Sequence, residues 1–166
     1  MLSMFSENGS NTISVLFVCL GNICRSPLAQ GVFMSEAVSR GLSHCFTFDS
    51  AGTGGWHAGD PPDPRSIATC AANGVDISAL RARKLLSIDY ERFDHIFAMD
   101  RNNLSDIRQM GSGRAETALF MEACLGKNKD VPDPYYGTKS DFDQVYRMVR
   151  TAADSWFETM AARVSG

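Results

Sequence analysis

The segment from Val15 to Pro27, VLFVCLGNICRSP, constrains the fold more than any other part of the sequence. It opens with apolar, β-branched and aromatic residues, which is typical of a buried strand. The pair Gly21-Asn22 then breaks the pattern, and both residue types tolerate positive φ. The pair Ser26-Pro27 suits the start of a helix, as N-cap and first helical residue. The segment therefore predicts a strand ending at Cys19, a tight loop over Leu20–Arg25 and a helix that follows it.

Two side chains of this segment carry chemistry. Cys19 is expected at the rim of the loop, near inward-turned N–H groups and the positive end of a helix. Thiol pKa values in such places fall to about 3.5–7.5, which favours the nucleophilic thiolate. Arg25 has a planar guanidinium group that can donate hydrogen bonds to two phosphate oxygens at once. The spacing C-x5-R-[ST] therefore predicts phosphoryl transfer, whereas a plain strand cysteine before a turn would leave Arg25 and Asn22 unexplained.

Composition narrows the class of protein. The chain has 166 residues, 44% of them hydrophobic and 21% charged, and a net charge of −3. These values predict one globular domain over residues 13–166 after a loose leader at residues 1–12, which lacks the features of a signal peptide. They predict neither a nucleic-acid surface nor a membrane span.

The cysteines and histidines give no metal or disulfide framework. There are five cysteines, an odd number without a C-x-x-C pair, so free thiols in the cytoplasm are expected. The histidines are isolated apart from His44, which adjoins Cys45, and this spacing does not suit zinc.

Strand and helix patterns alternate along the rest of the chain. Further strands are expected at 46–51, 95–99 and 118–121, and helices at 27–40, 65–73 and 103–110, with a partly helical stretch at 77–92. The last helix is expected to start at Ser140, with Asp143 completing a capping box. Its apolar stripe comprises Phe142, Val145, Val149, Ala152, Trp156 and Met160. The alternation implies an α/β fold with a parallel sheet covered on both faces, in which ligands bind at the carboxyl ends of the strands.

A second motif, DPYYG at 133–137, stands late in the chain. Pro134 keeps Asp133 extended and out of a helix. Two tyrosines in a polar loop can be aromatic cover for the core, or an aromatic wall beside a carboxylic acid. The motif alone leaves both readings open.

Together, VCLGNICRSP at 18–27 and DPYYG resemble the low molecular weight protein tyrosine phosphatase family, and the resemblance extends from Ser14 onward. It implies a doubly wound, four-stranded flavodoxin-like sheet. It implies hydrolysis of phosphotyrosine through a cysteinyl-phosphate intermediate, without metal or organic cofactor. The implied partners are phosphotyrosine proteins or small aryl phosphates, with inorganic phosphate or a similar oxyanion in the loop.

The resemblance also implies roles for single residues. Cys19 is the nucleophile, Arg25 binds phosphate, and Asp133 is the general acid and later the base. The loop residues that hold phosphate are Leu20, Gly21, Asn22, Ile23, Cys24 and Ser26. The pocket walls are Ile23, Trp56, Tyr135 and Tyr136, and the supporting residues are Ser50, Asp100 and Asn103. The Ser26 hydroxyl is expected to donate to the thiolate as well as cap the helix.

The sequence also departs from the family pattern. Leu80 stands where many members have a histidine, and Lys84 where many have glutamine. The resemblance therefore does not carry the family's hydrogen bonding behind the loop over to this chain, whereas it still implies the primary chemistry.

Other functions remain open. An arsenate reductase would need a close pair of resolving cysteines, which Cys70 and Cys124 are not, and protein-arginine phosphatases usually carry threonine at the position of Ile23. A non-catalytic phosphate-binding module would be expected to lose Cys19 or Asp133.

Overall fold

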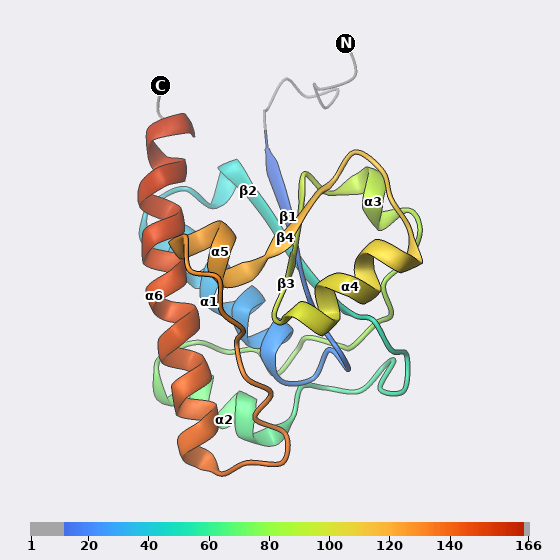
Figure 1. Ribbon diagram of the computed structural model, residues 1–166. Helices are drawn as coiled ribbons and strands as arrows, with labels where there is room; N and C mark the ends of the chain where they lie inside the picture. Colours follow the sequence, from blue (N-terminus) through green and yellow to red (C-terminus); the bar gives the residue numbers. More distant parts are fainter. Residues whose placement is uncertain (1–11, 165–166) are drawn as a thin grey trace.

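The computed structural model describes residues 12–164, so the expected leader lies outside the described residues except for Thr12. Four strands form one parallel sheet in the order β2-β1-β3-β4 (Figure 1). They are β1 (Ile13–Cys19), β2 (Phe46–Gly52), β3 (His95–Ala98) and β4 (Glu116–Leu119). The predicted parallel sheet is confirmed, and every strand begins within two residues of its expected place.

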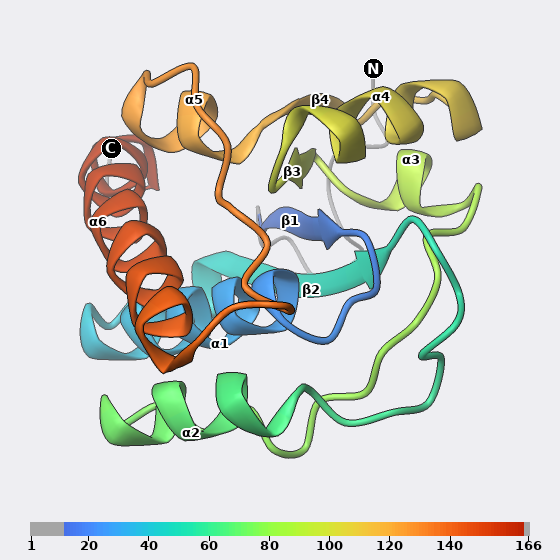
Figure 2. The ribbon, with the colours of Figure 1, turned by 60° about the horizontal axis from the view of Figure 1, so that its bottom comes forward.

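Helices cover both faces of the sheet, as the alternating pattern predicts. They are α1 (Arg25–Ser39), α2 (Pro64–Ala72), α3 (Asp89–Arg92), α4 (Arg101–Met110), α5 (Phe120–Leu125) and α6 (Lys139–Val164), with a 3-10 turn, η1 (Ser43–Cys45). The helices α1, α2, α5 and α6 gather on one side, and α3 and α4 lie on the other (Figure 2). Within the described part of the chain, no helix combines the length and the hydropathy that crossing a bilayer requires.

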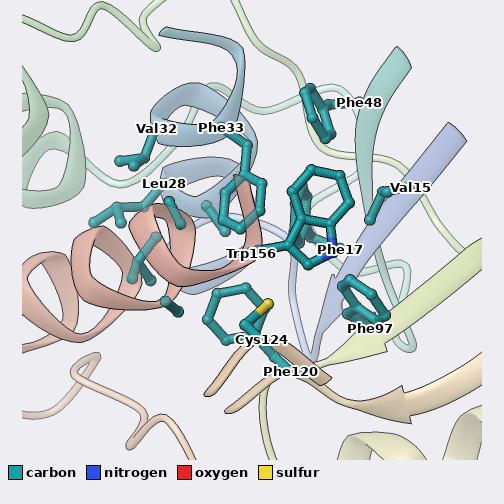
Figure 3. Close-up of a cluster of buried hydrophobic side chains, with 14 of the residues drawn as sticks. Val15, Phe17, Leu28, Val32, Phe33, Phe48, Phe97, Phe120, Cys124 and Trp156 are labelled. Atoms are coloured by element: carbon teal, nitrogen blue, oxygen red, sulfur yellow. The ribbon is translucent and has the colours of Figure 1, made fainter. Parts of the chain in front are cut away.

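The two faces of β1 build two separate cores. Val15 and Phe17 belong to the larger cluster, and Leu16 and Val18 to the smaller one beside α3 and α4. In the larger cluster the Phe33 ring of α1 lies 4.7 Å from Phe17 and 5.5 Å from Trp156 of α6, centroid to centroid (Figure 3). Aromatic packing of this kind fixes α1 and α6 against the strand that leads into the 20–24 loop.

Several helix boundaries differ from the predictions. The helix α1 starts at Arg25 with Cys24 as N-cap, so Ser26 lies inside the helix and does not cap it. The helix α6 starts at Lys139, and Asp141 accepts a hydrogen bond from the Thr138 N–H at 2.7 Å. The predicted cap at Ser140 is therefore wrong by two residues. The predicted apolar stripe of α6 is buried throughout.

The chain between residues 77 and 125 is less regular than predicted. The stretch at 77–92 holds only the single turn of α3. The predicted strand at 118–121 divides, because Phe120 and Met121 already belong to α5. Gly126 ends that helix in the left-handed conformation, with φ 68°. A short apolar run does not distinguish a strand from a buried helical turn.

Candidate active site

The loop between β1 and α1 is held from outside by its carbonyl groups. The carbonyl oxygen of Leu20 accepts from Gly54 N–H at 2.9 Å, that of Ile23 from Asp63 N–H at 2.8 Å, and that of Cys24 from the Ser66 hydroxyl at 3.2 Å. The backbone N–H groups of residues 20–24 donate to no acceptor in the described chain. A loop that is tied down through three of its carbonyls and whose amides are free is suited to bind an anion.

Asn22 gives the loop its shape. It has a φ of 58° and is the only non-glycine residue with positive φ among the described residues. Asparagine tolerates this conformation because its short amide can bond locally. The Asn22 amide is buried, donates to Ser26 Oγ at 2.8 Å and to Ser50 Oγ at 2.9 Å, and accepts from Arg83 N–H at 2.9 Å. Ser50, which was expected among the supporting residues, therefore lies in direct contact with the Asn22 amide.

Cys19 lies at the end of this hydrogen-bond chain. Its Sγ is 3.0 Å from Ser26 Oγ. Because Ser26 Oγ accepts from Asn22, its own proton is free to point to the sulfur. Ser50 in turn donates to Gln30 Oε1 at 2.7 Å. The chain therefore runs from the thiol into α1 and β2, and every hydroxyl along it has a partner.

Arg25 is almost completely buried, with 2% of its surface exposed. Its Nη1 donates to Asp100 Oδ2 at 2.6 Å and to the Val131 carbonyl at 3.0 Å, and its Nη2 lies 3.5 Å from Asp133 Oδ2. Burial opposes the charge, but Cys19 and then Asp100 outweigh it, so the pKa of Arg25 lies above its ordinary value. The guanidinium is therefore a permanent cation with a fixed direction.

Asp100 does more than the structural support expected of it. It caps α4 by accepting from Asn103 N–H at 2.7 Å, while Asn103 Oδ1 accepts from Asp100 N–H at 3.2 Å, a reciprocal capping box. The same side chain pairs with Arg25. One carboxylate thus sets both the start of a helix and the direction of the guanidinium.

The segment between α5 and α6 passes close to the start of α1 (Figure 2), and its Asp133 shares a pocket with the loop. Val131 N–H donates to the Met99 carbonyl at 2.8 Å, which ties this segment to the end of β3. Asp133 Oδ1 accepts from Tyr135 N–H at 3.1 Å. Arg65 holds Tyr135 in place, because its Nη2 donates to the Tyr135 carbonyl at 3.0 Å.

These groups line one pocket of about 210 Å³. It is lined by Cys19, Arg25 and Asp133, together with Leu20, Gly21 and Cys24 of the loop. Its remaining lining residues are Ile23, Trp56, His57, Tyr135 and Tyr136. Trp56 is 71% exposed and Tyr136 96% exposed. A nucleophile, a buried cation, free amides and a carboxylic acid therefore share one concave site with aromatic walls.

Over residues 14–165 the sequence matches the family described as low molecular weight phosphotyrosine protein phosphatase. The chain belongs to this family. A member from Schizosaccharomyces pombe is 44% identical over 92% of this chain and 99% of its own length. The fold resembles that of an Entamoeba histolytica protein tyrosine phosphatase, solved with Hepes in its active site. That structure has a TM-score of 0.85 and 31% identity, and the match covers 92% of this chain and 99% of the other.

A structure of the Drosophila arginine phosphatase is also similar to this phosphatase. It has a TM-score of 0.82 and 28% identity, and the match covers 88% of this chain and 96% of the other. The same scaffold therefore occurs in proteins named for different phosphorylated residues.

The two departures from the family pattern lie apart in the phosphatase. Leu80 is half-buried and packs against the larger core. The Asn22 amide forms its hydrogen bonds with Ser26, Ser50 and Arg83, without a histidine. Lys84 is exposed and pairs by a β-bridge with Gly52.

Cys24 is a free, buried thiol of the phosphatase. Burial first, and then Asp63, raise its pKa to about 12. Cys24 is therefore protonated at neutral pH.

The sequence reasoning missed two residues that serve the phosphatase site. Gln30 lies four positions after Ser26, and this spacing on one helix face is the signal that points to it. Arg65 links α2 to the segment with Asp133 and lies 4.5 Å from the Phe142 ring centroid. Nothing in its local sequence marks that contact.

Proposed function

We propose that Cys19, Arg25 and Asp133 carry out phosphotyrosine hydrolysis in this protein tyrosine phosphatase. The observation that supports these roles most directly is their common pocket, in which the thiol, the buried guanidinium and the free loop amides face one small volume. Arg25 and the amides bind the equatorial phosphate oxygens and stabilise the charge that develops on them. The substrates are phosphoproteins or small aryl phosphates, and the free phosphate product occupies the same loop.

In the first step the Cys19 thiolate attacks phosphorus and forms the S–P bond as the P–O bond to the tyrosine ring breaks. Asp133 donates its proton to the leaving phenolate, whose conjugate acid has a pKa of about 10. In the second step Asp133 takes a proton from water, and the water oxygen attacks phosphorus. The S–P bond breaks, and the Ser26 hydroxyl, 3.0 Å from the sulfur, stabilises the returning thiolate.

The pocket walls favour an aryl phosphate. Trp56 and the tyrosine pair suit a flat ring by stacking and apolar burial, and the two tyrosine rings lie edge to face with centroids 4.9 Å apart. Ile23 adds bulk without a hydrogen-bonding group, which disfavours a guanidinium. Phosphoserine is too short to bring its phosphate to the floor of the slot.

We place the reaction in the cytoplasm. All five cysteines, each within the described residues, are free thiols, which supports a reducing compartment.

The roles are tested by turnover and binding together. Cys19→Ser should abolish turnover and retain binding of inorganic phosphate, because the amides and Arg25 remain. Arg25→Ala should impair both. Turnover of phosphotyrosine peptides should exceed that of matched phosphoserine and phosphoarginine peptides by well over tenfold in kcat/KM. Appreciable turnover by Cys19→Ala would rule out the covalent mechanism, and a preference for phosphoarginine would change the substrate class.

A further inference from the structure

A second hollow adjoins the phosphate pocket. Its volume is about 430 Å³, and it shares Leu20 and Trp56 with the first pocket. The remaining lining comes from residues 53–55, Lys84 and the side of α4 that carries Asp106, Gln109 and Met110. Leu20 is 43% exposed, so the ridge between the two hollows is apolar and open to solvent. A peptide whose phosphotyrosine fills the first pocket therefore has room to extend over this ridge.

The chain after β2 fixes the wall of the second hollow. Gly52 N–H donates to the Arg83 carbonyl and Leu85 N–H to the Gly52 carbonyl, both at 2.8 Å. A Cβ on Gly52 would meet the Leu20 carbonyl oxygen at 2.8 Å, so only glycine allows this close approach. The Trp56 ring covers Gly54. The wall is thus built from backbone that is tied to both the phosphate loop and Lys84.

Thr53 has a buried hydroxyl without a hydrogen-bond partner. It is 9% exposed and lines the hollow, and its Oγ1 is the one buried side-chain oxygen or nitrogen among the described residues that forms no hydrogen bond. A buried hydroxyl without a partner costs about 1–3 kcal/mol, so such groups in native proteins call for an explanation. A ligand that accepts its proton would provide one.

Lys84 adds a charge on the same wall. Its β-bridge with Gly52 sets it beside Thr53, and its side-chain stem runs along Gly55, where a Cβ would lie 3.4 Å from Lys84 Cδ. The neighbouring Arg83 pairs with Asp49 and Asp89. Lys84 itself forms no ion pair with the residues that the structure describes. An ammonium group and a hydroxyl donor on one wall match a carboxylate. Asp106 of α4 also lines the hollow, and its carboxylate carries the opposite charge to Lys84.

We infer that this hollow is a subsite for an acidic side chain next to the phosphotyrosine of the substrate, and that Lys84 and Thr53 determine this preference. The inference rests on the proposed function, since the phosphotyrosine in the first pocket carries the neighbouring residue to the second.

The test compares phosphotyrosine peptides that differ in one flanking residue. Glu, Gln or Lys is placed in turn at successive positions on either side of the phosphotyrosine, and the ratio of kcat/KM for Glu over Gln is the readout. The ratio cancels any general loss of activity. At one position the parent protein should favour Glu by about three- to fivefold, as a partly exposed ion pair allows. Added salt should reduce the ratio.

Variants distinguish a local effect of the subsite from the overall electrostatic field of the protein. Lys84→Gln should bring the ratio close to one, and Lys84→Glu should shift the preference to the Lys peptide. Thr53→Val keeps the shape, removes the hydroxyl and should lower the ratio in part. Lys139→Gln is the matched control, because Lys139 is an exposed lysine on α6 that pairs with Asp143. An unchanged ratio in Lys84→Gln would overturn the inference. So would a parent preference for the Lys peptide that Asp106→Asn removes.

Binding separates this inference from the proposed chemistry. The same peptides are titrated against Cys19→Ser, in which the subsite is intact, and the same ratios should appear in Kd. If the parent protein hydrolyses no aryl phosphate, the proposed function fails, yet these titrations still decide the subsite. If aryl phosphates are hydrolysed and neither assay shows a ratio that depends on Lys84, the subsite alone is wrong.

Discussion

At the scale of single residues, the site depends on oxygen atoms that surround one cation. Arg25 is reached by Asp100, at the start of α4, and by the Val131 carbonyl and Asp133, which both belong to the segment between α5 and α6. A buried guanidinium needs such partners, because an unpaired buried charge is strongly destabilising. The phosphate site is therefore organised before substrate arrives.

Asp133→Ala should lower kcat most for substrates with poor leaving groups. A tyrosine phenolate needs a proton more than an activated nitrophenolate does, so we expect a loss of about 100-fold or more for phosphotyrosine and a smaller loss for nitrophenyl phosphate. Plotting kcat against leaving-group pKa for parent and variant measures the difference. Equal losses across the series would remove Asp133 from the role of acid.

The sequence predicts the reacting side chains better than their supports. Cys19 and Arg25 stand in one short motif, and the extended conformation of Asp133 follows from the proline after it. The contact of Arg25 with Asp100 spans 75 residues and depends on how β1 and β3 pair. No local pattern reports that pairing. The cap expected of Ser26 fails for a related reason, because its hydroxyl bonds to Cys19 and Asn22.

At the scale of elements, Asp63 joins the start of α2 to the active site. It accepts from Arg65 N–H at 2.9 Å as the N-cap of α2, and its Oδ2 pairs with Arg65 Nη2 at 2.9 Å. Arg65 then holds the Tyr135 carbonyl. The hydrogen bond from Arg65 holds the pKa of Asp63 below its usual range.

The stability contributed by the Asp63 charge should depend on pH in one direction. A lowered folded-state pKa adds stability that is present above the unfolded value of about 3.9 and is lost as pH falls through the folded value. The difference in free energy of unfolding between parent and Asp63→Asn should be constant above about pH 5 and shrink below about pH 4. Urea unfolding at several pH values measures it.

Asparagine is the matched change, since it caps helices about as well as aspartate. Asp63→Ala should lose the cap as well, at a cost of about 1 kcal/mol at every pH. A difference between parent and Asp63→Asn that persists at low pH would show that the charge is not the cause.

At the scale of the whole molecule, one aromatic cluster ties the long helices to the sheet. Phe33 contacts the rings of Phe17, Phe48, Phe120 and both aromatic residues at 156–157. Phe33→Ala should lower the free energy of unfolding by about 3–5 kcal/mol through the cavity it leaves. The next residue, Met34, is 46% exposed, so Met34→Ala should cost well under 1 kcal/mol. Denaturant unfolding compares the two, and similar losses would contradict this account of the core.

The pairing of β1 has a further consequence for how the molecule is made. A ribosome synthesises the chain from its N-terminus, so β1 emerges before the other three strands. Its neighbour β3 pairs with it from Val15 opposite His95, and this strand emerges only 80 residues later. Arg25 gains its hydrogen bond to the Val131 carbonyl later still, because Val131 lies 106 residues beyond it. A nascent chain can therefore display the phosphate-loop sequence long before it has the residues that fix the guanidinium. The thiol site is therefore complete only after residue 133 has emerged, and a chain that stops before that residue keeps the nucleophile without its acid.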